Sequence, residues 1–182
     1  MVRLENKLIN INKNRIGILG GTFDPAHKGH LKISQEARKK FFLKKVIWAV
    51  TKKNPLKKQS YLNLKERLKF AKKISKKNNF IKVSFFENKI KSNKTVDLIN
   101  YINKKNKNAK IYFIMGADNL INFHRWNKWK ELSSKCKILV FDRTGYKKKS
   151  KKSITYKRLN NKRLEFINFK KVNISSSQLR KI

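Results

Sequence analysis

Residues 20–30, with the sequence GGTFDPAHKGH, constrain the fold of this chain more than any other segment. They follow a short apolar run at residues 16–19 and precede an amphipathic stretch that begins near Leu31. This order predicts a buried strand, a turn and a helix. Paired glycines permit a tight bend and a close approach of a ligand, and Asp24-Pro25 is a turn signal. Because the start of a helix directs N–H groups and a positive dipole end at an anion, the segment predicts a phosphate-binding site.

Two histidines, His27 and His30, lie three positions apart at the predicted start of the helix. On a helix, residues with this spacing project from the same face. Two imidazoles beside a phosphate-binding turn suit the stabilisation of charge on a phosphoryl group during its transfer. The pair is therefore a candidate catalytic centre.

The same segment resembles the HxGH signature of the nucleotidyltransferase superfamily, and looks most like the bacterial nicotinate-nucleotide adenylyltransferases. A chance glycine-rich turn with two surface histidines is the alternative, and the length of the match disfavours it. The resemblance implies that His27 and His30 are catalytic. It also implies a group of residues that bind ATP, beginning with Gly20, Gly21, Thr22 and Phe23.

The reaction that this resemblance implies joins ATP to nicotinate mononucleotide and gives nicotinate adenine dinucleotide and pyrophosphate. The attacking 5′-phosphate is already anionic at neutral pH, so no general base is required. Catalysis then consists of positioning and of neutralising charge, a task that Mg²⁺ shares in other phosphoryl transfers. Mg²⁺ is therefore the expected cofactor, brought with ATP.

The C-terminal residues 174–180, ISSSQLR, resemble the second signature of the family. Serine hydroxyls and free N–H groups at a helix start can hold a triphosphate, and an arginine can bind phosphate oxygens at two points. The resemblance thus adds Ser175, Ser176, Ser177 and Arg180 to the expected ATP site. Taken alone, three serines are an ordinary helix N-cap, and it is their pairing with the histidine segment that favours phosphate binding.

Two central segments resemble those that distinguish this family from the other families of the superfamily. Residues 50–57, VTKKNPLK, look like the loop that covers the mononucleotide and ends in a lysine, here Lys57. Residues 115–129, MGADNLINFHRWNKW, resemble a Gly-x-Asp motif followed by an aromatic loop. Asp118 is then expected to accept hydrogen bonds from ribose hydroxyls of ATP, and Trp126 to stack on the pyridine ring of the mononucleotide.

Thr95, in the sequence TVDL, matches the substrate-side threonine of the family. Each of these central residues also has a purely structural interpretation. Lys57 can be one solvated charge among many, Asp118 and Thr95 can be helix N-caps, and Trp126 can be a packing residue. The residues alone leave both interpretations open.

Strand and helix patterns alternate along the chain. Apolar runs predict strands at residues 15–19, 46–50, 80–86, 111–115, 138–141 and 164–169. Helical spacing predicts helices at residues 29–40, at 63–77 and from Thr95 onward. This alternation predicts an α/β fold, a single Rossmann-like, doubly wound parallel sheet with helices on both faces. The ligand is expected at the carboxyl ends of the strands.

Length and composition predict a single domain over residues 1–182, and the resemblance implies that it is a nucleotidyltransferase domain. Residues 146–163 are Lys-rich and poor in apolar side chains, which predicts a basic loop or insert within the domain. We find no apolar run long enough to span a bilayer, no signal peptide and a single cysteine. A cytoplasmic protein without membrane contact is therefore expected.

The formal net charge of +39 raises a different class of function, a basic nucleic-acid-binding module. The lysines are spread through nearly every predicted helix and loop, so we expect no specific nucleic-acid partner. The field still favours anionic partners such as ATP and nicotinate mononucleotide. Spacings typical of metal ligands, such as CxxC or HExxH, do not occur, and no protein-built metal site is expected.

Two other adenylyltransferases of the superfamily stay open, one for nicotinamide mononucleotide and one for pantetheine phosphate. His27 and the SSSQLR tail argue against the pantetheine enzyme, in whose signature a threonine or serine replaces the first histidine. The sequence does not indicate an oligomeric state.

Overall fold

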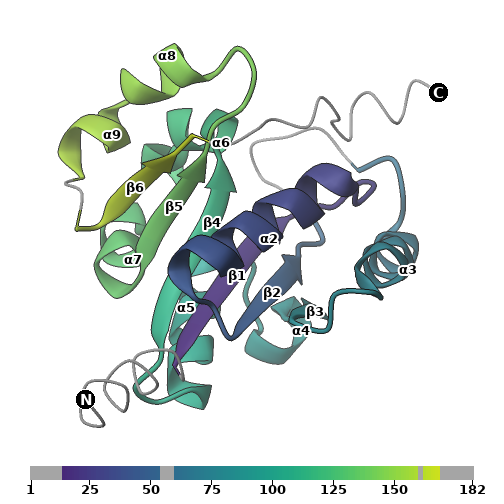
Figure 1. The fold of residues 1–182 in the computed structure, drawn as a ribbon. Helices are drawn as coiled ribbons and strands as arrows, with labels where there is room; N and C mark the ends of the chain where they lie inside the picture. Colours follow the sequence, from purple (N-terminus) through teal and green to yellow (C-terminus); the bar gives the residue numbers. More distant parts are fainter. Residues whose placement is uncertain (1–13, 54–59, 160–161, 169–182) are drawn as a thin grey trace, which may run out of the picture.

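The computed structural model describes residues 14–53, 60–159 and 162–168. In this part of the chain, six parallel strands form one sheet in the order β3-β2-β1-β4-β5-β6 (Figure 1). The strands are β1 (Arg15–Gly21), β2 (Lys45–Val50), β3 (Ile81–Phe85), β4 (Lys110–Gly116), β5 (Lys137–Phe141) and β6 (Leu164–Ile167). The chain places β2 and then β3 on one side of β1, and then β4, β5 and β6 in turn on the other side of β1. The predicted doubly wound parallel sheet is confirmed.

Helices cover both faces of the sheet (Figure 1). The face with α2 (Lys28–Phe41) and α3 (Leu64–Ser75) lies opposite the face with α5 (Thr95–Lys105) and α7 (Trp129–Lys135). The shorter helices are α4 (Glu87–Ile90), α6 (Ala117–Ile121), η1 (Phe123–Arg125), α8 (Lys147–Lys151) and α9 (Ile154–Arg158). Within the described ranges, no helix has the length and apolar character needed to cross a membrane.

Successive side chains of the central strands enter two different apolar cores. On β4, Ile111, Phe113 and Met115 face α5 and α7, whereas Tyr112 and Ile114 face α2 and α3. All five side chains are buried. A parallel strand that is covered on both faces needs apolar residues at every position, which is why the strands appear in the sequence as unbroken apolar runs.

Two helix starts agree with the sequence because their signals are local. Asn63 caps α3: its side chain accepts a hydrogen bond from Glu66 N, and the Glu66 carboxylate accepts one from Asn63 N, both at 3.0 Å. Such a reciprocal pair satisfies two N–H groups that the helix itself leaves free. Helix α5 begins at Thr95, as predicted, and buries Val96, Ile99 and Ile102.

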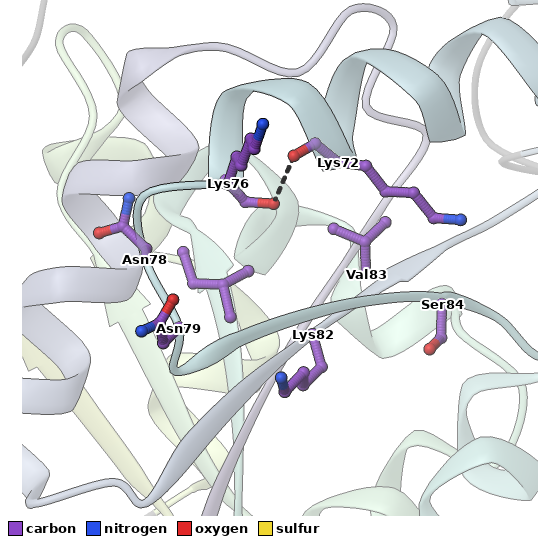
Figure 2. Close-up of a pocket in the computed structure, with 9 residues that line it drawn as sticks. Lys72, Lys76, Asn78, Asn79, Lys82, Val83 and Ser84 are labelled. Carbon is purple, nitrogen blue, oxygen red and sulfur yellow. Dashed lines mark hydrogen bonds between the residues drawn. The ribbon is translucent and has the colours of Figure 1, made fainter.

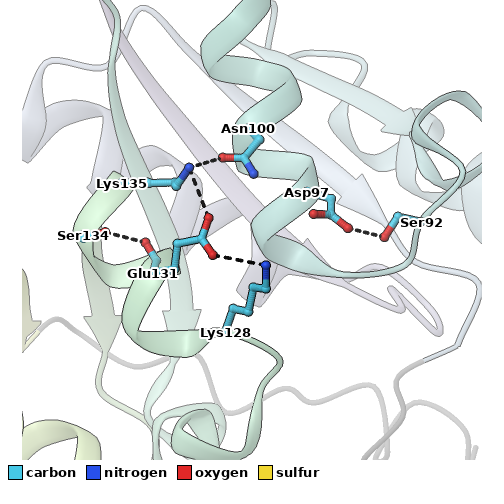
Figure 3. A network of polar contacts seen from close by, with 7 residues as sticks. All are labelled: Ser92, Asp97, Asn100, Lys128, Glu131, Ser134 and Lys135. Carbon is cyan, nitrogen blue, oxygen red and sulfur yellow. Dashed lines mark hydrogen bonds and ion pairs between the residues drawn. The ribbon is translucent and has the colours of Figure 1, made fainter.

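A polar network joins α5 to α7 at the surface (Figure 3). Lys135 Nζ lies 2.7 Å from Asn100 Oδ1 and 3.2 Å from the Glu131 carboxylate. Lys128 pairs with the same carboxylate at 3.7 Å. Exposed pairs of this kind add little stability, so the apolar core rather than this network holds α7 on the sheet.

Residues 146–163 differ from the predicted basic loop. Helices α8 and α9 form there and pack against α6. The side chains that they bury are small and polar: Ser150 and Thr155 are both fully buried. Ser153 caps α9 by accepting a hydrogen bond from Tyr156 N at 3.2 Å. The fully buried positions carry hydroxyls, and apolar contacts with the core come from the half-buried Tyr156 and Leu159. The sequence therefore shows no clear helical periodicity there.

Trp48 on β2 holds α2 against the sheet through a buried hydrogen bond. Its indole Nε1 donates to Ser34 Oγ at 2.8 Å, and both side chains are fully buried. We expect Ser34→Ala to lower the free energy of unfolding by about 1–3 kcal/mol, because the indole N–H then lacks an acceptor. Urea denaturation followed by circular dichroism measures the change.

Ser134→Ala is the matched control, because Ser134 is an exposed helical serine whose hydroxyl donates within its own helix, to Glu131 O at 2.7 Å. We expect this variant to unfold at nearly the wild-type urea concentration. Equal losses of stability in the two variants would contradict the role assigned to the Trp48 hydrogen bond.

Candidate active site

The carboxyl ends of β1, β4 and β5 lie at one edge of the sheet, around the point where the strand order reverses. The connections that leave this edge carry residues 22–27 after β1, 117–118 after β4 and 142–143 after β5. Open α/β sheets bind ligands at this point because neighbouring connections diverge to opposite faces. The fold therefore places both histidines and Asp118 at the predicted edge.

The turn after β1 begins later than the sequence indicated. Gly20 and Gly21 are the last residues of β1 and pair with Ala49 and Val50 of β2. The chain leaves the strand at Thr22, and the left-handed conformation falls on Phe23, with φ of 49°. A Cβ on Gly20 would lie 3.2 Å from the Phe113 ring. Gly20 thus allows close packing at the strand end, and the bend is made by the next residues.

Backbone N–H groups bind the Nδ1 atoms of both His27 and His30 at the start of α2. His27 is the N-cap, with an extended backbone, and its Nδ1 accepts from Gly29 N at 3.1 Å. His30 Nδ1 accepts from His27 N, also at 3.1 Å. His27 therefore lies just outside the helix on which the sequence placed both residues, yet the ring centroids are 3.9 Å apart. Since each Nδ1 is an acceptor, the proton of each neutral ring is on Nε2.

Buried aromatic rings support the histidine pair. The His30 ring lies 4.7 Å from Phe23 and 5.9 Å from Trp48, and these two rings stack on each other at 5.1 Å. Both aromatic side chains are fully buried. This packing restricts the rotation of the His30 ring and holds its Nε2–H donor in a defined position.

The environment keeps His27 neutral. Burial, together with the positive charge of Arg143, lowers the pKa of His27 from 6.5 to about 4. At neutral pH the ring is therefore a hydrogen-bond donor through Nε2 and not an imidazolium. A cation near a histidine and a backbone N–H on its Nδ1 act in the same direction, because both disfavour the doubly protonated ring.

Arg143 was not identified from the sequence. It follows β5, and its Nη1 pairs with Asp118 Oδ2 at 2.7 Å. The residue that joins Asp118 is thus 25 positions further along the chain. Its place directly after the strand predicted at residues 138–141 was the available signal, because every strand of a parallel sheet ends at the same edge.

The N-cap interpretations of Asp118 and Thr95 are wrong. The N-cap of α6 is Gly116, and Asp118 lies in the first turn. The N-cap of α5 is Lys94, and Thr95 is the first helical residue. Neither side chain caps its helix, because the residue in the cap position is an earlier one.

Trp126 directly follows η1 as its C-cap and is half-buried, on the face of the sheet that α5 and α7 cover. Its ring lies 5.9 Å from Phe113 and 5.1 Å from Phe123. The packing interpretation of this tryptophan is therefore confirmed, while its contact with a pyridine ring stays a prediction.

Several expected site residues lie outside the described residues, and their roles stay predictions: Lys57, Ser175, Ser176, Ser177 and Arg180. In the part that the structure describes, no three His, Cys, Asp or Glu side chains gather as metal ligands.

A buried arginine on α3 is a second residue that the sequence did not reveal. Arg67 is only 2% exposed. Its guanidinium donates to the backbone carbonyls of Thr22, Thr51, Lys52 and Leu62. Burial lowers the pKa of Arg67, but an arginine stays protonated at any physiological pH. In the sequence it is one of many basic residues, and only the fold shows that it is inside.

A surface pocket of about 340 Å³ is lined by residues of α3, of β3 and of the segment between them (Figure 2). Its lining includes Lys72 and Lys76 from the end of α3, and Lys82 from β3. Ile81, also in the lining, is the first residue of β3 and pairs with Val46 near the start of β2. The pocket is therefore at the amino end of the strands and is not part of the histidine site.

The low pKa of His27 predicts how stability depends on pH. The unfolded chain protonates this histidine near pH 6.5, and the folded chain only near pH 4. Between these values the unfolded state binds more protons, so the free energy of unfolding should fall as the pH is lowered through this range. Urea midpoints measured across the range test this.

His27→Asn is the informative comparison, because asparagine keeps an N-cap acceptor for Gly29 N but does not titrate. Its urea midpoint should fall less between these pH values. Arg143→Met should raise the pKa of His27 in an NMR titration, because a nearby cation is removed. The same pH dependence in the wild type and in His27→Asn would contradict the assignment.

This chain is similar to proteins of known families. A model of the cytidylyltransferase-like family matches residues 18–182. A protein of Pelagibacter ubique, named probable nicotinate-nucleotide adenylyltransferase, is 68% identical over the full length of both chains. A Bradyrhizobium protein of the same name is 42% identical over 71% of this chain and 67% of its own.

Solved structures show the same fold. The Plasmodium falciparum nicotinic acid mononucleotide adenylyltransferase complexed with NaAD matches with a TM-score of 0.71 and 20% identity. The match covers 92% of this chain and 83% of that chain. Together with the identity to the curated relatives, these matches show that the chain belongs to the cytidylyltransferase-like family and, within it, to the nicotinate-nucleotide adenylyltransferases.

Proposed function

We propose that this protein transfers the adenylyl group of ATP to nicotinate mononucleotide, giving nicotinate adenine dinucleotide, a precursor of NAD, and pyrophosphate. The histidine pair at the start of α2 carries the proposal, because both Nδ1 atoms accept backbone hydrogen bonds, which leaves Nε2–H donors at the edge where a nucleotide binds, and because His27 is kept neutral. The full-length relative is named for this activity, and related structures hold NaAD in one case and APC in another.

In this reaction an oxygen of the mononucleotide 5′-phosphate forms a bond to the α-phosphorus of ATP. The bond from that phosphorus to the bridging oxygen breaks, and pyrophosphate leaves. The nucleophile is an anion, so no proton has to be removed from it. Because backbone N–H groups occupy both Nδ1 atoms, neither neutral ring has a nitrogen lone pair left to act as a base. We assign to His27 and His30 the stabilisation of charge on the phosphate oxygens in the transition state.

The ion pair of Arg143 and Asp118 supplies two further groups at the same edge. A guanidinium binds phosphate oxygens at two points, and a carboxylate at this position accepts hydrogen bonds from ribose hydroxyls. We therefore propose that Arg143 contacts phosphate and that Asp118 contacts the ribose of ATP. Their mutual contact holds both side chains in place. The remaining proposed ATP contacts are Gly20, Gly21, Thr22, Phe23, Ser175, Ser176, Ser177 and Arg180.

On the mononucleotide side we propose Lys57, Thr95 and Trp126. The indole of Trp126 is half-buried, which leaves part of the ring available for stacking on a pyridine. Thr95 is half-buried at the first position of α5, and its side chain does not act as the N-cap of that helix.

Adenylyl transfer from ATP generally involves a divalent metal ion. The described residues form no metal cage of their own, which fits an ion whose ligands come mostly from phosphate oxygens. We propose that this ion is Mg²⁺ and that it arrives with ATP. When bound with ATP, such an ion would supply positive charge that offsets the charge of the leaving pyrophosphate.

The proposed function predicts the products and the choice of substrate. With ATP and nicotinate mononucleotide, the purified protein should release pyrophosphate and form the dinucleotide, as measured by a coupled assay and chromatography. The kcat/KM should be higher for the nicotinate than for the nicotinamide form. N–H donors that bind the carboxylate would face an NH₂ group in the amide and would lose their acceptor. Equal kcat/KM values would contradict this specificity, and no pyrophosphate with either substrate would contradict the function.

Loss of the His30 ring should lower kcat by roughly 10²-fold, the effect of removing a donor that stabilises transition-state charge. His30→Gln is the sharper variant, because glutamine at this position can still accept a hydrogen bond from the N-cap N–H. His30→Ala removes that bond as well. His124→Ala, which replaces the histidine outside the signature, is the control and should keep nearly full kcat. If His30→Gln also keeps full kcat at saturating substrate, the ring has no catalytic role.

A further inference from the structure

The guanidinium of Arg67 connects the two backbone segments that border the proposed substrate sites. Its Nη1 donates to the carbonyl of Thr22, after β1, and to that of Thr51, after β2, both at 2.7 Å. Its Nη2 donates to Lys52 O and its Nε to Leu62 O, both at 3.0 Å. One side chain thus fixes the turn after β1 and both ends of the connection from β2 to α3.

Carboxylates reinforce the same arrangement. Asp24 is buried and accepts hydrogen bonds from two consecutive backbone N–H groups, of Tyr61 at 2.8 Å and Leu62 at 2.9 Å. Glu87 accepts a hydrogen bond from the Thr51 hydroxyl and another, at 3.0 Å, from Lys52 N. Both anions interact favourably with the guanidinium, which offsets part of the cost of burying its charge.

The two segments also contact each other directly, because Thr51 N donates to Gly21 O at 3.0 Å. The turn after β1 leads within a few residues to His27, and it contains the proposed ATP contacts Thr22 and Phe23. The segment after β2 begins the connection on the mononucleotide side. A displacement of either segment therefore strains hydrogen bonds to the other.

We propose that Arg67 is a positioning residue that fixes the ATP side and the mononucleotide side of the site relative to each other. It touches neither substrate and acts through the carbonyls of Thr22, Thr51 and Lys52. The identity of the two substrates rests on the proposed function, whereas the shared anchor rests on these hydrogen bonds.

The geometry requires arginine in particular. A planar guanidinium has five N–H donors in a fixed fork, and here it reaches four carbonyls that lie on different segments. A lysine ammonium has three donors at one point and cannot reach them all. Arg67→Lys should therefore restore part of what Arg67→Met loses.

The test compares Arg67→Met and Arg67→Lys with Lys69→Met, which removes an equal charge from an exposed position on the same helix. Affinities for ATP and for nicotinate mononucleotide are measured separately by calorimetry, well below the unfolding temperature of each variant. We expect Arg67→Met to weaken both substrates and to lower kcat by roughly 10²-fold, as small misplacements of binding groups do. Arg67→Lys should be intermediate, and Lys69→Met close to the wild type.

A purely structural role predicts a different result, namely a lower unfolding temperature with both affinities and kcat unchanged while the protein is folded. That result would overturn the proposal, and so would weakened binding of one substrate alone. If Arg67→Met does not fold, Arg67→Lys decides by the same criteria.

Hydrogen–deuterium exchange gives a readout that does not depend on activity. Peptides that contain residues 20–25 and 50–53 should exchange faster in Arg67→Lys than in the wild type, with no such change in Lys69→Met. Unchanged exchange in both segments would overturn the proposal. If the wild type makes no dinucleotide but this exchange pattern is found, the proposed function fails and the shared anchor stands.

Discussion

The hydrogen bonds of the buried Arg67 guanidinium hold together the connections that leave the carboxyl ends of β1 and β2. Irregular connections leave many backbone carbonyls without partners in a ladder or a helix, and a buried carbonyl without a partner is costly. Here one cation inside the protein satisfies four of them, and Asp24 and Glu87 satisfy N–H groups of the same segments. The unusual backbone at Phe23, and with it the start of α2, is thereby held against the sheet.

The histidine site follows from this arrangement. The backbone at the start of α2 binds both Nδ1 atoms, and Phe23 and Trp48 pack against His30, so these contacts help to orient the two rings. Burial and Arg143 then keep His27 neutral. Neutral donors suit a reaction whose nucleophile is already an anion. The formal net charge of +39 gives only a general attraction for anions, because salt screens such a field beyond about 8 Å. Local groups therefore determine where the substrates bind.

Much of the fold could be predicted because its signals are local. The apolar runs of the strands, the Asn63 cap and the buried positions of α5 all agree with the structure. The predictions that were wrong concern residues whose structure depends on contacts with segments that are distant in the sequence. Ser150 and Thr155 are buried without any apolar pattern, so α8 and α9 were not foreseen. The bend expected at Gly20 and Gly21 lies after them, because pairing with β2 continues to the end of β1.

The sequence by itself determined the order of the strands and of the long helices α2, α3 and α5, the edge at which the ligand is expected and the histidine segment that defines the family. These properties depend on residues that are adjacent or one helical turn apart. Only the tertiary structure decided which groups complete the site. Arg67 meets Thr22 across 45 positions, and Arg143 meets Asp118 across 25. No local pattern separates Arg67 from the many other basic residues, and the place of Arg143 after a predicted strand indicates the edge of the sheet but not its partner. A charged side chain becomes a structural or binding group only where folding brings it to its partners.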